Sequence, residues 1–351
     1  MKIIYLYQNL ASYHLTQFIK LAELENEIHI FQKKKIVNSF FKSKFFGKKI
    51  FIYDKKKYDY QKLKNFIRKI NPNILVVAGW VDFLYLRLAI TFKNKKIIRV
   101  VHADNIWNAK LKQQILRLFG LFNFLYLFFD KAWVHGPLQF EYVKKIGFKS
   151  KDIIFDHASA DDKFFHKLYK ENYNAKKKKY PKTFLFFSRR EKIKGLETLM
   201  KSWKSLNLNN NINWELNIIG SGFFKISKTK LKNVKIFQHK SHEEMKKIIK
   251  NSGCFILPSI QEPWGVVVHE MSSAGLPLIL SDTVGSRYTF LIHKKNGFVF
   301  EHGNYKSLER AMKNIMSLSD RELLIMSDTS FKLSSRISTN SSVHNLLSLE
   351  V

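Results

Sequence analysis

Residues 257–270 decide the fold, and their sequence is LPSIQEPWGVVVHE. A short apolar run ends at Leu257, a loop follows, and a helix is predicted from Val266 through Ser273. Gly265, at the end of the loop, permits a close approach of the backbone to a neighbouring group. The start of the predicted helix offers unpaired N–H groups and the positive end of the helix dipole, which suit a phosphate. The segment therefore predicts an anion-binding strand, loop and helix.

Two carboxylates flank this anion-binding position. Glu262 stands in the loop, and Glu270 stands about one turn into the predicted helix. Carboxylates accept hydrogen bonds from sugar hydroxyls, while the helix start donates to a diphosphate. Taken singly, each glutamate is more simply interpreted as a solvated surface residue. The order of the whole segment, followed by AGLPLILSD at 274–282, favours the ligand-binding interpretation.

The rest of the chain repeats this alternation of short apolar runs and longer amphipathic stretches. The runs predicted to be strands lie at 2–7, 27–31, 50–53, 74–77, 97–101, 131–134, 183–187, 215–219, 234–237, 254–257, 277–281 and 297–300. Such alternation predicts parallel sheets joined by crossover helices. The strands are largely apolar, which indicates that both faces of each sheet are covered.

The predicted domain boundary is a segment without apolar periodicity. Residues 171–182 contain four consecutive lysines, whose like charges repel one another and resist packing. We therefore predict an N-terminal domain over 1–170, a linker over 171–182 and a C-terminal domain over 183–324. The serine-rich tail, 325–351, either packs back on the N-terminal domain or frays.

The charge of the chain is strongly positive. Its 351 residues include 61 Lys and Arg against 28 Asp and Glu, a net charge of +33. Codon bias toward lysine explains part of this excess but not the shortage of acidic residues. The charge therefore predicts attraction to polyanions such as nucleotides, phosphorylated lipids, an anionic membrane or nucleic acid.

Several classes of protein are disfavoured by what the sequence lacks. Cys254 is the single cysteine, which rules out an intrachain disulfide and makes a zinc cluster improbable. The twelve histidines show no metal-binding spacing. No segment reaches the roughly 18 apolar residues of a spanning helix, and the start of the chain predicts a strand rather than a signal peptide. We expect a cytoplasmic protein, soluble or peripheral on the inner face of the plasma membrane, with no metal and no cofactor.

Two further segments belong to the same predicted domain. The sequence FSRREKIKG, residues 187–195, follows its first strand, and LNIIGSG, residues 216–222, predicts a strand followed by a G-x-G turn. The first of these segments carries the cations Arg189 and Lys194, and fixed arginine and lysine side chains can balance phosphate charge without a metal. An ordinary basic loop is the simpler interpretation for Lys192.

Together these segments resemble the family-4 retaining glycosyltransferases of the GT-B fold, of the surface-polysaccharide type. Glu262 and Glu270 correspond to the E-x7-E signature of that family. The resemblance is specific from about Arg189 to Gly297 and diffuse before that. It implies an α/β protein with two Rossmann-like domains, whose parallel sheets face a central cleft and whose C-terminal domain binds most of the sugar nucleotide.

The resemblance also implies a role for individual residues. Arg189 and Lys194 correspond to the basic pair on the donor diphosphate, Glu270 to the ribose ligand, and Glu262 to the ligand of the transferred sugar. The remaining donor-binding positions are Ser188, Gly220, Gly222 and the backbone N–H groups of Trp264, Gly265 and Val266. Ser188 replaces a family glycine, and Phe223 and His239 also depart from the pattern, which leaves the base open between UDP and GDP.

The N-terminal domain offers fewer indications. By the resemblance, a polar residue after the strand at 97–101 faces the reaction centre from the acceptor side, and His102 is the first candidate and Asp104 the second. A structural role for His102 weighs equally. His14, ahead of the first helix, is a candidate for contact with the acceptor or the diphosphate, although a helix-start residue is the plainer interpretation.

A stretch of interleaved lysines and phenylalanines, residues 31–57, fits an anionic membrane surface. Single-stranded nucleic acid fits less well, and a basic loop whose phenylalanines join the core is the alternative. The apolar run 118–129 is a second candidate for contact with a lipid-linked acceptor, but a buried helix is the interpretation we prefer.

The function predicted from these features is the transfer of a hexose, with retention, from a UDP- or GDP-sugar to a glycan or lipid-linked acceptor. Bacterial surface polysaccharide, such as lipopolysaccharide, is the expected product by analogy with the family. The partners expected are the sugar nucleotide and the acceptor, with no specific nucleic acid. The alternatives are another GT-B enzyme, such as a sugar-nucleotide epimerase or a phosphorylase, and a basic nucleic-acid-binding protein.

Overall fold

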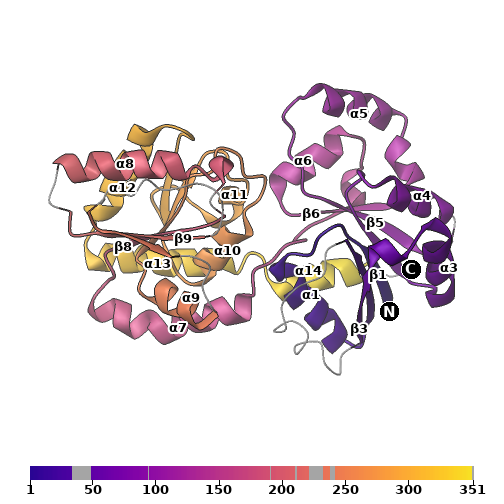
Figure 1. The fold of residues 1–351 in the computed structure, drawn as a ribbon, viewed down its shortest axis with the longest axis horizontal. Helices are drawn as coiled ribbons and strands as arrows, with labels where there is room; N and C mark the ends of the chain where they lie inside the picture. Colours follow the sequence, from indigo (N-terminus) through magenta and orange to yellow (C-terminus); the bar gives the residue numbers. More distant parts are fainter. Residues whose placement is uncertain are drawn as a thin grey trace. The chain divides into compact units, whose positions relative to one another are not determined.

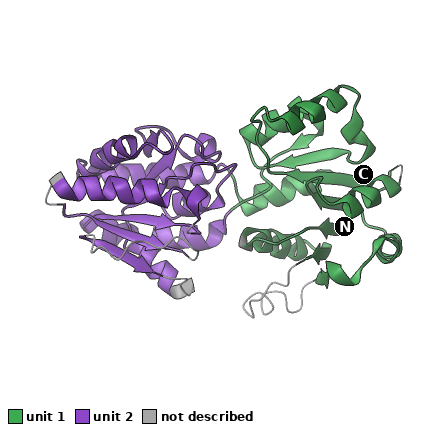
Figure 2. Cartoon of the chain, turned by 45° about the horizontal axis from the view of Figure 1, so that its top comes forward, with its two compact units in different colours: residues 1–159, 337–351 green, residues 160–336 purple. Residues whose placement is uncertain are grey.

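A computed structural model describes residues 1–33, 49–93, 95–189, 191–209, 212–220, 232–237 and 242–349. The chain forms two compact units, shown in Figure 2. Unit 1 comprises Met1–Ser159 and Ile337–Val351, and unit 2 comprises Ala160–Arg336. Each unit has a parallel sheet with helices on both faces, as the alternation of strands and helices predicts.

Unit 1 has a seven-stranded sheet in the order β3-β2-β1-β4-β5-β6-β7, and every neighbouring pair is parallel. Its strands are β1 (Lys2–Leu6), β2 (Glu27–Gln32), β3 (Ile50–Asp54), β4 (Ile74–Ala78), β5 (Ile98–Ala103), β6 (Lys131–Val134) and β7 (Ile153–Ile154). Its helices are α1 (Ser12–Glu23), α3 (Tyr60–Ile70), α4 (Phe83–Thr91), α5 (Leu111–Leu121), α6 (Pro137–Lys145) and α14 (Thr339–Leu347), with short 3₁₀ turns η1 (Lys55–Lys57), η2 (Phe124–Leu127) and η3 (Ser150–Asp152).

Unit 2 has a six-stranded sheet in the order β10-β9-β8-β11-β12-β13, again parallel throughout. Its strands are β8 (Thr183–Phe187), β9 (Glu215–Ile219), β10 (Val234–Phe237), β11 (Cys254–Leu257), β12 (Leu278–Ser281) and β13 (Gly297–Phe300). Its helices are α7 (Asp162–Lys178), α8 (Leu196–Asn209), α9 (His242–Lys250), α10 (Val266–Ser273), α11 (Arg287–Phe290), α12 (Tyr305–Met316) and α13 (Asp320–Ser334), with the 3₁₀ turn η4 (Lys192–Lys194).

The central strands of each sheet are buried on both faces. In β1, Ile3 and Tyr5 belong to one apolar cluster, and Ile4 and Leu6 belong to another on the opposite face. Because side chains alternate along a strand, two buried faces require an unbroken apolar run. In both sheets the strand order reverses beside the first strand, between β1 and β4 and between β8 and β11. Ligands of such sheets bind at the carboxyl ends of the strands around this reversal.

Residues 171–182, predicted to be a linker, are helical through Lys178 because α7 continues across most of them. Successive side chains of a helix point about 100° apart, so the consecutive lysines are spread around it, and cations at its C-terminus suit the helix dipole. One of them, Lys176, is buried and donates to the Gly275 carbonyl at 3.2 Å. The units instead join at residues 159–160 and 336–337.

The serine-rich tail is shared between the units. Helix α13 stays with unit 2, whereas α14 packs beside α1 in unit 1, as Figure 1 shows. Val343 and Leu346 of α14 are fully buried in the apolar cluster that also contains Phe18 of α1. The C-terminal segment is therefore part of the core of unit 1.

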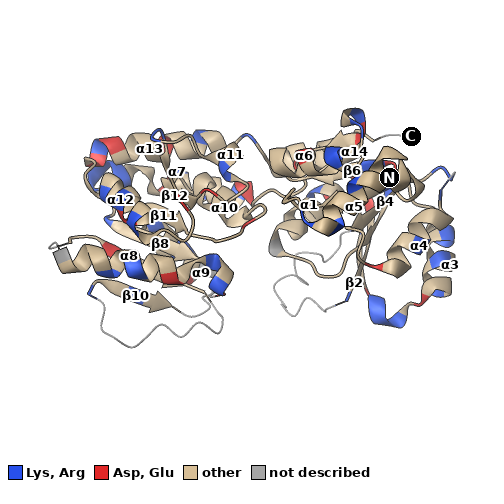
Figure 3. Ribbon diagram, turned by 90° about the horizontal axis from the view of Figure 1, so that it is seen from above, with Lys and Arg blue, Asp and Glu red and all other residues tan. Residues whose placement is uncertain are grey.

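Lysines and arginines lie on the helices of both units, and acidic residues are sparser, as Figure 3 shows. Of the stretch 31–57 predicted to contact a membrane, residues 34–48 lie outside the described residues. Among the described residues, no helix combines the length and hydrophobicity needed to span a membrane.

Candidate functional site

The candidate site of unit 2 lies at the carboxyl ends of β8, β9, β11 and β12, where the segments predicted to bind the donor meet. The loop after β8 is fixed to the loop after β11 by two hydrogen bonds. The Ile260 N–H donates to the Ile193 carbonyl at 2.8 Å, and the Lys194 ammonium donates to the Glu262 carboxylate at 2.5 Å. Both charged side chains are only 13% exposed, so the ion pair is shielded from water.

Glycine is required where these two loops touch. Gly195 has a φ of +69°, and a Cβ built there would lie 1.7 Å from the Pro258 carbonyl oxygen. Only glycine combines that conformation with such a close approach. The same holds between the loops after β8 and β9, where a Cβ on Gly220 would lie 1.8 Å from the Ser188 carbonyl oxygen. The glycines of both motifs therefore bring separate loops into backbone contact.

The loop after β11 is also fixed to the loop after β12. The Gly285 N–H donates to the Glu262 carbonyl at 2.9 Å. The hydroxyls of Ser281 and Thr283 both donate to the Ser259 carbonyl, at 2.6 and 2.8 Å. Glu262 is thus held at its backbone by one neighbouring loop and at its carboxylate by the other.

Helix α10 begins at this edge. Gly265 caps it with a left-handed backbone, and the buried Trp264 packs against Phe290 with ring centroids 6.1 Å apart. The first N–H groups of an α-helix have no partner within the helix, so the start of α10 offers donors to an anion. Burial, together with the nearby Asp161 carboxylate, raises the pKa of Glu270 to about 7.

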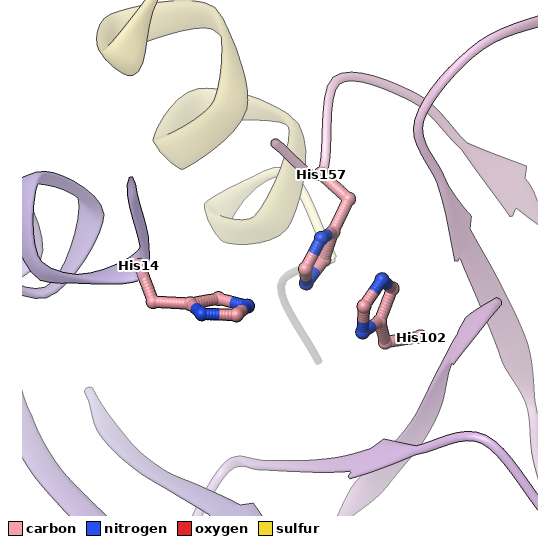
Figure 4. A group of neighbouring side chains, drawn as sticks. All are labelled: His14, His102 and His157. Atoms are coloured by element: carbon pink, nitrogen blue, oxygen red, sulfur yellow. The ribbon is translucent and has the colours of Figure 1, made fainter. Parts of the chain in front are cut away.

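In unit 1, histidines from separate segments converge at the carboxyl edge of the sheet. Figure 4 shows His14 from the first turn of α1, His102 from the end of β5 and His157 from the segment after β7, with their rings directed toward one another. Each offers a ring nitrogen, and these nitrogens lie within 4.8 Å of one another. His135, after β6, adds a fourth ring, with its Nε2 3.3 Å from Nε2 of His102.

Hydrogen bonds orient these rings. The Ala11 N–H donates to Nδ1 of His14 at 3.0 Å, which leaves the proton of the neutral ring on Nε2. That Nε2 is buried and has no hydrogen-bond partner among the described residues. His157 bonds through Nε2 to the Tyr7 hydroxyl at 2.8 Å. Its backbone carbonyl accepts from Gln17 at 3.0 Å, so α1 positions two of the rings.

A metal ion fits this histidine cluster poorly. The rings of His102 and His157 are stacked, with centroids 3.4 Å apart and planes inclined by 9°, so their nitrogen lone pairs run side by side rather than converging. The bond from Ala11 places a proton on the His14 nitrogen that faces the cluster. Metal-bound imidazole needs a lone pair at that position. The expectation that no metal is needed stays a prediction.

The histidines are neutral at pH 7. Burial lowers the pKa of His14 and of His135 to about 3, and a neighbouring histidine adds to the effect in each. Burial and neighbouring histidines also hold the pKa of His102 and of His157 well below the ordinary range. The cluster therefore presents uncharged donors and acceptors rather than cations.

Comparison with known proteins identifies the domain that carries the first set of loops. Residues 169–328 match the family model described as Glycosyl transferases group 1. The chain thus carries a glycosyl transferases group 1 domain. This match covers most of unit 2 and less than half of the chain. An uncharacterized glycosyltransferase of Methanocaldococcus jannaschii is 27% identical over 143 residues, which are 39% of this chain and only 36% of that relative.

Solved structures with the same fold cover nearly the whole chain. A glycosyltransferase from Rickettsia africae has a TM-score of 0.74 at 15% identity, covering 99% of this chain and 97% of its own. Anabaena HepE in complex with UDP has a TM-score of 0.74 at 13% identity, covering 99% of both chains. The lipopolysaccharide outer core galactosyltransferase WaaB has a TM-score of 0.65 at 14% identity, again covering 99% of both. These likenesses show the fold, which is the GT-B fold predicted from the sequence.

The glycosyl transferases group 1 domain brings together most of the residues predicted to bind the donor. Lys194, Glu262, Gly265 and the start of α10 share one edge of the sheet. Arg189 is described but does not join them, because its side chain is 71% exposed and pairs with Glu191 at 2.9 Å. Gly222 lies outside the described residues.

In unit 1 the structure gathers His14 with His102, whose ring centroids are 6.3 Å apart. Asp104 follows β5 but is exposed. Sequence reasoning missed Tyr7, His135 and His157. Each stands just after a strand at the same edge of the sheet, and comparing the residues that follow parallel strands would have revealed them.

Proposed function

We propose that this protein is a retaining, metal-independent glycosyltransferase that moves a hexose from a UDP- or GDP-sugar to a glycan or lipid-linked acceptor. Surface polysaccharide of the lipopolysaccharide kind is the expected product. The observation that carries the proposal is the locked pair of loops at Lys194 and Glu262, beside the start of α10, within a glycosyl transferases group 1 domain.

In this proposal the start of α10 and Lys194 hold the donor diphosphate. A diphosphate draws the Lys194 ammonium away from Glu262, whose freed carboxylate accepts hydrogen bonds from the hydroxyls of the transferred sugar. The cation is then already in place where negative charge develops on the leaving phosphate. Arg189 supplies a second cation once it leaves Glu191, and Glu270 binds the ribose hydroxyls.

Unit 1 is proposed to hold the acceptor. The His14 Nε2–H is a buried donor directed into the histidine cluster. A hydroxyl or a phosphate oxygen satisfies that donor without bringing a positive charge into a buried site. His102, neutral at pH 7, is the polar group proposed to face the reaction centre. Asp104, exposed at the end of the same strand, is the second candidate.

Thermal unfolding with a panel of sugar nucleotides tests the proposal. UDP-glucose enters the panel first, because HepE was crystallised with UDP and with UDP-glucose. A ligand at about 100 times its dissociation constant adds roughly 2.7 kcal/mol of stability. We expect one nucleotide class to raise the melting temperature of the wild type, Glu270→Gln to lose that shift, and Glu197→Gln, on the exposed face of α8, to keep it.

Product analysis then tests the reaction. NMR of the product should show that the transferred sugar keeps its anomeric configuration. Consumption of donor without an acceptor would indicate an epimerase instead, and release of sugar phosphate would indicate a phosphorylase. Steeply salt-dependent binding to nucleic acid, with no shift by any sugar nucleotide, would refute the proposal in favour of a nucleic-acid-binding protein.

A further inference from the structure

Helix α5 of unit 1 carries its large apolar side chains on its outer face. Leu111, Ile115, Leu118, Phe119 and Phe122 are all exposed, from 44% at Ile115 to 84% at Phe122. Their spacing of four, three, one and three residues places them along a single face of the helix and its C-cap. An ordinary surface helix buries such a stripe against the core.

The inner face of α5 is narrow and only partly apolar. Leu116 is the residue that packs against the core cluster, and Gln113 donates to the Ile106 carbonyl at 2.8 Å. Gly120 lies so close to the end of α6 that a Cβ there would be 2.2 Å from the Ile146 carbonyl oxygen. The helix is thus held by a leucine, an amide and a glycine contact, together with Phe119, whose ring centroid lies 5.2 Å from that of Phe124. The side chains of the stripe nevertheless stay exposed.

The buried helix preferred from the sequence for residues 118–129 is therefore wrong for the first half of that run. Leu125 and Phe129 are buried, but Leu118 through Phe122 are exposed except at Gly120. The spacing of the apolar residues is the same whether this face of the helix meets the core or the solvent, so the sequence pattern does not distinguish the two orientations. The close contact at Gly120, together with Leu116 and Gln113, fixes which face points outward.

Positive charge surrounds the apolar stripe. Residues 105–129 contain Lys110, Lys112 and Arg117 and no acidic residue. The end of α6, which Gly120 contacts, adds Lys144 and Lys145, and the Lys145 ammonium lies 5.3 Å from the centre of the Trp107 ring. An apolar stripe bordered by cations matches the surface of a bilayer that contains anionic lipid.

We propose that α5 docks unit 1 on an anionic lipid surface, with its apolar stripe among the headgroups and its lysines at the lipid phosphates. Two other occupants fit less well. A second copy of the chain brings the same net charge of +33 and is repelled. Nucleic acid stacks on aromatic rings, whereas the α5 stripe is mostly leucine and isoleucine. This inference concerns residues that belong to neither site cluster, and it does not depend on the proposed reaction.

Flotation of the full chain with vesicles tests the inference. We expect binding to vesicles of phosphatidylcholine with phosphatidylglycerol and much weaker binding to phosphatidylcholine alone. The double variant Leu118→Gln/Phe122→Gln should lose at least about tenfold in affinity, because it removes two large apolar side chains from the lipid-contacting face. Lys110→Gln should lose about fivefold, the equivalent of roughly 1 kcal/mol per cation at an anionic surface.

The matched control is Leu208→Gln, which removes an equally exposed leucine from α8 of unit 2. It should bind like the wild type, and all variants should keep the wild-type circular dichroism and melting temperature. Equal vesicle binding by the α5 double variant and the Leu208 control would overturn the inference. So would equal binding to neutral and anionic vesicles, or a dimer in solution that the double variant abolishes.

Discussion

Acidification should destabilise unit 1 well above the range in which carboxylates titrate. When the pKa of a histidine is lower in the folded protein than in the unfolded chain, the ring is neutral in the folded protein at a pH between the two values. It then takes up a proton only when the protein unfolds. Its contribution to stability is complete above a pH of about 6.5 and is lost as the pH falls toward the folded pKa. For His14 and His135 the folded pKa is about 3, so the window extends from about 6.5 to about 3.

The expected magnitude follows from the number of buried rings. Each such histidine changes the unfolding equilibrium roughly tenfold per pH unit within the window, or about 1.4 kcal/mol. His14 and His135 together should cost roughly 3 kcal/mol between pH 7.5 and 5.5. His102 and His157, whose pKa values are lowered further, should bring the loss to about 5 kcal/mol, a large share of the stability of a domain.

Urea unfolding between pH 7.5 and 5.5 measures this slope. The fluorescence of Trp133 reports on the cluster, because its ring lies 4.5 Å from the His157 ring. His157→Asn should reduce the change in the unfolding equilibrium constant between pH 7.5 and 5.5 by about tenfold, whatever its effect on stability at pH 7.5. His302→Asn, in unit 2, should leave the slope measured for unit 1 unchanged. A midpoint for unit 1 that does not move over this range would refute the reasoning.

Three further outcomes are expected. Gly195→Ala should destabilise unit 2 by more than about 1 kcal/mol in denaturant, because of its positive φ and the neighbouring carbonyl. Gly303→Ala, at a similar φ in open space, should cost less. Lys194→Ala should lower kcat about a hundredfold. Lys201→Ala, on the exposed face of α8, should leave kcat unchanged. Leu346→Ala in α14 should destabilise unit 1 by about 2–5 kcal/mol, and retained stability in urea would contradict its place in the core.

Much of the fold could be predicted from local pattern. The runs at 183–187 and 254–257 coincide with β8 and β11, because a strand buried on both faces is an almost unbroken apolar run. The runs at 215–219 and 234–237 likewise coincide with β9 and β10. The consecutive lysines at 176–179 predicted a linker, whereas α7 continues through Lys178, because a helix points successive charged side chains in different directions. Strand β7, only two residues long, has too little sequence to carry a pattern.

For the candidate sites too, the sequence could predict what depends on neighbouring residues but not what depends on contacts between distant segments. The loops of unit 2 that are proposed to bind the donor could be recognised in the sequence, because their residues lie close together in it and carry a characteristic spacing. The pairing of Lys194 with Glu262 was not predicted, because it joins residues separated by 68 positions. The histidine cluster draws His14, His102, His135 and His157 from four separate segments, and no single stretch of sequence shows that they meet.

The return of α14 to unit 1 has a consequence for how the chain is made. Residues 1–159 leave the ribosome long before Val343 and Leu346 exist, so the face of α1 that these residues cover stays open to water during synthesis. Domains ordinarily fold in the order of their synthesis. Here the synthesis of unit 2 is complete at Arg336, before the last segment of unit 1 has been made. The N-terminal unit is completed last, when the Ser342 hydroxyl reaches Gln17 and the backbone of His157.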